Sequence, residues 1–269
     1  MTRRSLMALA FARPSLKINK LELIPIRATE RTVWLFVRLA TDKKLTGLGE
    51  ASDAFGFAGT TKANAEKMEA ELGNFFELIQ GRSPLEIERY RQLGEPRARA
   101  GGLVAATAYS AIEQALWDLT GQALDQPIHA LLGGPVLLTL PLYANINRCV
   151  EAMRAAVGPQ TRLMIDCHSF FDVERAVDVA RRLEPLNLAW YEGARRSEAC
   201  RRNGANPPSH QAAGGETLFG VDGFVPLCRS KAVEVIMPDV KHGGGVKEMT
   251  YIAAMARAEG YRHVARQWI

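Results

Sequence analysis

Acidic residues recur at a nearly constant spacing in the second half of the chain, and this limits the possible folds more than any other feature. Asp166, Glu192, Glu216 and Asp239 are separated by 26, 24 and 23 residues. Each interval is about the length of one strand followed by one helix. At least three of the four acids stand where an apolar, strand-like run ends, so the spacing predicts a repeated structural unit with an acid at one fixed place.

The segments between these acids support the same interpretation. Alternating strands and helices are typical of a parallel sheet, here a β/α barrel. In such a barrel the carboxyl ends of all strands face one mouth, so the acids are expected to converge. Strands are predicted over 142–146, 162–165, 188–191 and 233–237, and helices over 151–157, from Asp172 to Leu183 and over 246–259.

Converging carboxylates repel one another unless a cation or protons compensate their charge. A site built only from oxygen ligands favours a hard ion, and Mg²⁺ is the natural candidate. The alternative for each acid taken alone is a helix N-cap or a surface-loop charge. Three acids in register favour the metal site.

The first half of the chain has a different pattern, typical of an α+β module. Strands are predicted over 16–28, 33–39 and 45–51, the last two as a hairpin in which Gly47 and Gly49 allow a close approach. Helices are predicted over 62–80, from the capping box Ser83–Glu86, which puts Pro84 at the first helical position, and from about Leu103 onward. The last of these places apolar residues at helical spacing.

Composition excludes several other classes of protein. No apolar run is long enough to cross a membrane, and no Cys-x-x-Cys pair occurs among the four cysteines, so we expect reduced thiols in a cytoplasmic protein. The net charge of +5 comes from residues 1–14, 193–211 and 261–269, while the rest is mildly acidic, so no nucleic-acid partner is expected. We interpret residues 1–15 as a tail, although its apolar run also resembles a very short signal peptide.

Several longer motifs resemble the enolase superfamily, in its mandelate racemase/muconate lactonizing enzyme branch. They are AYSAIEQALWDLTG at 108–121, LLGG at 131–134, MIDCH at 164–168, AWYE at 189–192, AGGETLF at 213–219 and MPDVKHGG at 237–244. The resemblance implies an α+β capping domain at 16–135 and a TIM-type β/α barrel domain at 136–269. It implies that Asp166, Glu192 and Glu216 bind Mg²⁺.

The resemblance also implies a reaction. Family members remove the proton next to a substrate carboxylate, and the metal stabilises the enediolate that forms. Racemisation, cycloisomerisation or loss of water can follow, so the expected partner is a small carboxylate such as a sugar acid. Both the substrate and homo-oligomerisation stay open.

Individual residues can be given expected roles on the same basis. His168 resembles the histidine of sugar-acid dehydratases that protonates a leaving hydroxyl; the alternative is a histidine that lines the barrel without reacting. Asp239 resembles a carboxylate that orients a catalytic histidine; the alternative is a helix cap. Lys241 and His242 are expected in a solvated loop. The segment 52–60, with Phe55 and Phe57, resembles a lid over the substrate, and a simple surface turn is the alternative.

Three departures from the family pattern point to an incomplete barrel. The interval from Asn145 to Asp166 has no room for the strand that carries the family's lysine base. Residues 193–211 have no apolar period, and we expect little order over 195–211. The family continues beyond residue 269 with a histidine-bearing strand. A second interpretation therefore stays open: a catalytically inactive remnant that acts as a scaffold or as the partner of an intact paralogue.

Overall fold

The computed structural model describes residues 16–30, 32–55, 59–134, 139, 149–167, 171–192, 211–231 and 233–263. The chain divides into two compact units. Unit 1 comprises residues 1–136 together with Lys241–Lys247, and unit 2 comprises residues 137–240 and 248–269. Among the described residues, no helix combines the length and the apolar character that crossing a membrane requires.

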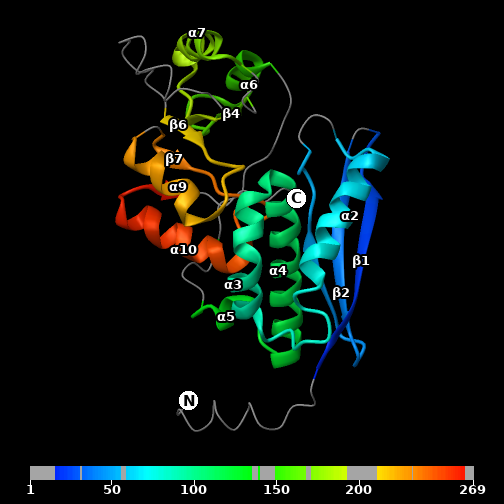
Figure 1. Cartoon of the computed structure of the whole chain (residues 1–269). Coiled ribbons are helices and arrows are strands. Elements are labelled where there is room, and N and C mark those ends of the chain that lie inside the picture. Colours follow the sequence, from blue (N-terminus) through cyan, green and yellow to red (C-terminus); the bar gives the residue numbers. More distant parts are fainter. Residues whose placement is uncertain are drawn as a thin grey trace. The chain divides into compact units, whose positions relative to one another are not determined.

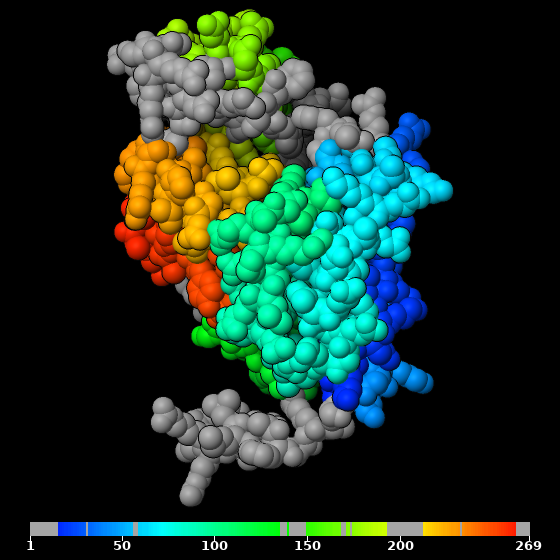
Figure 2. Space-filling model, viewed as in Figure 1, coloured from blue at the N-terminus to red at the C-terminus, as the bar shows by residue number. Residues whose placement is uncertain are grey.

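Unit 1 is a three-stranded antiparallel sheet covered by helices, as the sequence predicts. The sheet has the strand order β1-β2-β3, and α2 and α4 stand beside it (Figure 1). In the space-filling view, the cyan and blue-green residues of α2 and α3 form a continuous surface next to the blue strand β1 (Figure 2). The elements are β1 (Ile18–Arg27), β2 (Val33–Thr41), β3 (Thr46–Glu50), α2 (Lys62–Phe76), α3 (Ile87–Ala100), α4 (Gly102–Leu124) and α5 (Ile128–Leu131).

The core of unit 1 lies between the sheet and α4. Alternate residues of β2, namely Leu35, Val37 and Leu39, are fully buried, as period-two alternation requires. Gly47 and Gly49 of β3 face α4 so closely that a Cβ at either position would overlap a backbone carbonyl of that helix. The predicted close approach at these glycines is therefore confirmed, and it brings the sheet directly onto the helix backbone.

Two expected helix boundaries in unit 1 were wrong. The capping box was expected to start a helix at Pro84, but α3 begins at Ile87. Ser83 and Glu86 instead close a turn, in which the Leu85 N–H donates to Ser83 Oγ at 3.3 Å and the Ser83 N–H to Glu86 Oε1 at 3.4 Å. The helix that starts at Lys62 ends at Phe76 and continues as turns to Gln80.

Unit 2 contains a parallel sheet with the strand order β4-β5-β6-β7-β8. Among the described residues, helices connect β4 to β5, β6 to β7 and β7 to β8, which is the β/α alternation that the sequence predicts. The elements are α6 (Val150–Val157), β4 (Met164–Asp166), α7 (Val173–Leu183), η2 (Glu184–Leu186), β5 (Trp190–Glu192), β6 (Gln211–Gly214), α9 (Gly220–Arg229), β7 (Val235–Ile236), α10 (Gly245–Ala258) and β8 (Arg262–His263).

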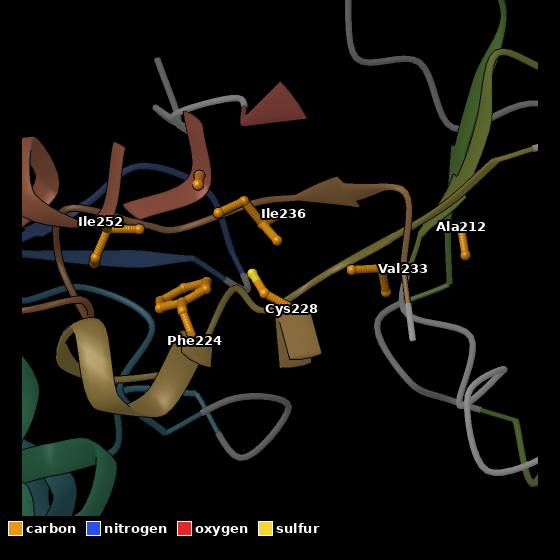
Figure 3. Close-up of a cluster of buried hydrophobic side chains, with 7 residues drawn as sticks. Ala212, Phe224, Cys228, Val233, Ile236 and Ile252 are labelled. Atoms are coloured by element: carbon orange, nitrogen blue, oxygen red, sulfur yellow. The ribbon is translucent and has the colours of Figure 1, made fainter. Parts of the chain in front are cut away.

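The helices of unit 2 pack on one face of this sheet. Phe224 and Cys228 of α9, Ile252 of α10 and Ile236 of β7 belong to one buried cluster (Figure 3). A second cluster joins α7 to Tyr191 of β5. The opposite face is lined by a separate group, Trp190, Ala213, Val235 and Met237. Side chains alternate along a strand, so the first two clusters mark the face that the helices cover. The third group marks the opposite face, on which the acids lie.

Candidate metal centre

The three neighbouring strands β4, β5 and β6 position the predicted metal ligands. Parallel pairing aligns Asp166 with Glu192, and Glu192 with Ala213. Asp166 and Glu192 therefore end their strands at the same level. Glu192 lies two residues after Trp190, so its side chain is on the same face as Trp190, opposite the helices. Asp166 pairs with Glu192 and is on that face too.

Glu216 reaches the same place by way of a glycine turn after β6. Gly215 has a φ of +108°, which L side chains rarely adopt, and a Cβ there would come within 2.7 Å of the Phe224 ring. The turn therefore requires glycine for its backbone conformation and for the packing of α9. It allows Glu216, three residues beyond Ala213, to approach the ends of β4 and β5.

The structure brings the three predicted acids together. One carboxylate oxygen each from Asp166, Glu192 and Glu216 lies within 4.8 Å of the others. Glu192 is buried, with 5% of its surface exposed, while the other two are half-buried. Like charges this close, and partly removed from water, are unfavourable unless a cation or protons offset them. The donor set is oxygen only and still open to solvent on two members, which fits a hard divalent ion that keeps some of its water.

The remaining predicted site residues have different outcomes. Asp239 follows β7 and is fully buried, but it is not part of the acidic group formed by the described residues. Phe55 is half-buried in a turn of unit 1. His168, Phe57 and the segment 195–210 lie outside the described residues, so their predictions are untested.

The expectation for Lys241 and His242 was wrong, because neither residue is in a solvated loop. Lys241 is 3% and His242 2% exposed. Lys241 Nζ forms an ion pair with Asp53 Oδ2 at 2.6 Å, and His242 Nδ1 lies 2.8 Å from Thr107 Oγ1. Sequence reasoning missed these two residues because their partners are more than 130 positions away, and no local periodicity marks the contact.

Burial shifts the pKa of His242 and that of Glu113 in opposite directions. Burial, and next the charge of Lys241, lowers the pKa of His242 to about 4, so its imidazole is neutral at pH 7. Burial raises the pKa of Glu113 to about 7, although N–H donors from Lys247, Trp117 and Val246 and the charge of Arg91 oppose that rise. These polar groups belong to unit 1 and are separate from the acidic group of unit 2.

Comparison with known families agrees with this fold. Residues 17–133 match the N-terminal domain of the mandelate racemase/muconate lactonizing enzymes, and residues 142–268 match the enolase C-terminal domain-like family. The chain belongs to the mandelate racemase/muconate lactonizing enzyme branch of the enolase superfamily. Its architecture is that of an α+β capping domain combined with strands and helices of a TIM-type barrel.

The relatives with named activities share about a quarter of their residues with this chain. The chain is 26% identical to D-galactonate dehydratase of Variovorax paradoxus, over 84% of this chain and 69% of the relative, and 27% identical to the Xanthomonas campestris enzyme over the same shares. The 3,6-anhydro-D-galactonate cycloisomerase of Zobellia galactanivorans has a TM-score of 0.79 at 25% identity, covering 94% of this chain and 80% of the other.

A structural neighbour with a bound metal has the same fold. L-Talarate dehydratase of Polaromonas, solved with Mg and L-glucarate, has a TM-score of 0.71 at 21% identity, covering 94% of this chain and 81% of the other. At this identity the likeness shows the fold alone. The galactonate dehydratases place the chain close to the sugar-acid dehydratases within its family.

Proposed function

We propose that Asp166, Glu192 and Glu216 bind Mg²⁺, and that the chain uses this site to hold a sugar-acid carboxylate while the proton on the adjacent carbon is removed. The observation that carries the proposal is the approach of one carboxylate oxygen from each acid to within 4.8 Å of the others, on the sheet face opposite the described helices. The names of the relatives, which are dehydratases and a cycloisomerase of galactonate-type acids, support this substrate class.

The chain's own residues have distinct tasks in this proposal. A bound Mg²⁺ supplies positive charge opposite the carboxylate oxygens on which negative charge develops as the proton leaves. Glu192, the most buried of the three acids, would hold the ion from the end of β5. His168, two residues after Asp166, is the candidate acid that protonates a leaving hydroxyl, and Asp239 is a buried carboxylate for orienting a catalytic group.

Phe55, in the turn after β3, is the candidate apolar contact for the carbon chain of the substrate, and Phe57 shares this role in the proposal. Loss of water and racemisation both begin with the same proton removal. The relatives' names favour the first outcome, giving dehydration of a sugar acid. The domain limits 16–135 and 136–269 belong to the same proposal.

A second candidate is a metal-binding remnant without turnover, which acts as a scaffold or as the partner of an intact paralogue. One observation favours it. α6 ends at Val157 and β4 begins at Met164, so residues 158–163 alone connect them. That connection has no room for a further strand and helix, which is where the family resemblance places a lysine base. Loss of a positioned base lowers a rate by roughly 10²–10⁴-fold.

Solvent deuterium exchange at the α-carbon of D-galactonate and related sugar acids separates the two candidates. The full chain is incubated with Mg²⁺ in D₂O, and exchange is followed by NMR against a metal-only control. Exchange above that background supports the enzyme. If it persists in His168→Ala, His168 keeps the proposed role of acid for the leaving hydroxyl; if it disappears, His168 is instead the base that removes the α-proton. Background exchange together with tight Mg²⁺ binding supports the remnant. Absence of Mg²⁺ binding contradicts both.

A further inference from the structure

Unit 1 holds a short segment from far along the chain, Lys241–Lys247, which we call the strap. Three residues of α4 contact it in order. Thr107 Oγ1 lies 2.8 Å from His242 Nδ1, Ser110 Oγ accepts from the Gly244 N–H at 3.0 Å, and the Glu113 carboxylate accepts from the Val246 and Lys247 N–H groups at 2.6 and 3.0 Å. Every third residue of the helix thus holds about every second residue of the strap.

These contacts leave the strap little freedom to shift. Thr107 Oγ1 also donates to the Leu103 carbonyl at 2.7 Å, so its single proton is used there and the neutral His242 donates from Nδ1. A Cβ at Gly245 would overlap the Glu113 carboxylate, so this glycine allows the close approach. The strap is therefore fixed along α4 from His242 to Lys247.

Lys241 is the first residue of the strap, and its positively charged side chain is buried. Its side chain is 4% exposed, while that of its partner Asp53 is 53% exposed. Burying an ammonium group is costly unless an opposite charge and hydrogen bonds compensate. The neighbouring His242 adds no second positive charge, because its pKa is lowered to about 4. The Lys241–Asp53 pair, at 2.6 Å, joins the strap to the turn after β3.

Asp53 lies in a turn whose backbone needs support. Its φ is +64°, in the left-handed region that few non-glycine residues occupy. The turn's first residues are tied to β2, because the Ala51 N–H donates to the Leu35 carbonyl at 2.7 Å and the Leu35 N–H donates to Ser52 Oγ at 3.0 Å. Phe55 follows two residues after Asp53.

We propose that Lys241 is a positioning residue. Through its ion pair with Asp53 it holds the turn 51–55 in the conformation that presents Phe55. What Phe55 then contacts rests on the proposed function, whereas the ion pair and its effect on the turn do not. Lys241 would thus fix the position of an apolar residue in this turn without touching any reacting atom.

Hydrogen exchange of the full chain tests this without any turnover. The amides of Leu35 and Ala51 report opening of the turn, and those of Gly244, Val246 and Lys247 report release of the strap. In Asp53→Asn we expect the turn amides to exchange roughly 10- to 100-fold faster, as for loss of a hydrogen bond to a charged group. The strap amides should keep their rates, because α4 still holds them.

Asp53→Glu separates the charge from the backbone preference. Asparagine tolerates a positive φ better than glutamate, so a purely conformational role predicts faster turn exchange in Asp53→Glu than in Asp53→Asn. An ion pair predicts the reverse, because glutamate keeps the negative charge. Turn exchange in Asp53→Asn equal to that of the unaltered chain, or Asp53→Glu exchanging as fast as or faster than Asp53→Asn, would overturn the proposal.

Lys241→Met and its matched control complete the test. Methionine fills the buried space without the charge, and we expect the turn to open as in Asp53→Asn, with no further increase when both substitutions are combined. Lys62→Met makes the same change at a lysine whose side chain is 93% exposed, and should leave the turn unchanged. Additive effects of Lys241→Met and Asp53→Asn would contradict a shared contact.

Discussion

The polar groups of the two units are arranged in opposite ways. On α4 and the strap, buried polar side chains meet complementary partners: Glu113 meets N–H donors, Ser110 an N–H, and Lys241 a carboxylate. In unit 2, Asp166, Glu192 and Glu216 bring like charges within 4.8 Å. The first arrangement offsets the cost of burying polar groups with partners from the chain itself, whereas the second needs a cation or protons to offset its charge. The contrast is consistent with a structural use of the buried polar groups in unit 1 and with the proposed metal-binding use of the acids in unit 2.

Replacing Glu192, the most buried of the three acids, should have the largest effect and tests whether the acids of unit 2 serve metal binding or the fold. In Glu192→Gln we expect Mg²⁺ affinity to fall by about 10²-fold or more, because one charged ligand is lost. Without metal, the same variant should be at least as stable as the unaltered chain, because a like charge is removed. Calorimetric titration with Mg²⁺ and thermal unfolding in EDTA measure the two effects.

Glu174→Gln is the matched control for this pair of effects, since Glu174 is an exposed acid on α7. It should leave Mg²⁺ affinity unchanged and, because Glu174 lies in the first turn of α7, lower stability by no more than about 1 kcal/mol. If Glu192→Gln bound Mg²⁺ as tightly as the control, the acidic group would not be a metal site. If Glu192→Gln destabilised the metal-free chain, the acids would serve the fold as those of unit 1 do.

A second prediction concerns the pH dependence of unit 1. His242 has a pKa of about 4 in the fold against 6.5 ordinarily, so its contribution to stability is present above pH 6.5 and is lost as pH falls through 4. Glu113 has a pKa of about 7 against 4.5, so its contribution is present below pH 4.5 and is lost as pH rises through 7. Each amounts to about 3 kcal/mol over its window, and the two offset each other near pH 4.5–6.5.

Single substitutions should reveal the two slopes. In His242→Asn, the free energy of unfolding should fall as pH rises from 4.5 to 7, because only Glu113 then responds. In Glu113→Gln, it should rise with pH between 4 and 6.5. Denaturant unfolding in EDTA across this range measures both. Parallel slopes in the two variants would show that these groups do not have the environments described here.

In unit 2 the sequence predicts the positions of the acidic residues better than the first and last residues of the strands. The spacing of the acids locates the strand ends, because one strand and one helix fix the interval and parallel pairing fixes the level. The strands themselves are shorter than predicted: β7 covers Val235–Ile236 within the predicted 233–237. Short buried runs do not show where hydrogen bonding stops, so their ends depend on neighbouring strands.

In unit 1 the helix faces were predictable and the strap was not. Of the six apolar positions predicted for α4, five are buried and Val104, in the first turn, is half-buried. The buried ones are Ala108, Ile112, Ala115, Leu116 and Leu119. The strap sequence, KHGGGVK, is polar and rich in glycine, which is typical of a loop. Its burial depends on Asp53, Thr107, Ser110 and Glu113, and nothing in the local sequence connects it to them.

A third prediction tests how closely the sheet and α4 are joined. Gly49→Ala should destabilise the chain by about 1–3 kcal/mol, as overpacking does, because the new Cβ would overlap the Ala111 carbonyl and backbone must move. Gly73→Ala, in α2, has open space around its Cβ and should stabilise by up to about 1 kcal/mol. Denaturant unfolding measures both. Equal signs for the two substitutions would contradict the close contact of β3 with α4.

The smallest expected effect compares a helix cap from each unit. In unit 2, Asp172 Oδ1 accepts from the Arg175 N–H at 2.8 Å at the start of α7, and in unit 1, Thr61 Oγ1 accepts from the Asn64 N–H at 3.2 Å at the start of α2. Asp172→Ala should lower the free energy of unfolding by about 1 kcal/mol, and Thr61→Ala by less, because its hydrogen bond is longer and its oxygen uncharged.

Asp172→Asn keeps an accepting oxygen and removes the charge, so its stability should lie between that of Asp172→Ala and that of the unaltered chain. The free energies of unfolding of the three variants, measured in EDTA, give the order. A loss in Asp172→Asn as large as in Asp172→Ala would assign the whole effect to charge at the helix N-terminus, and a larger loss in Thr61→Ala would reverse the comparison of the two caps.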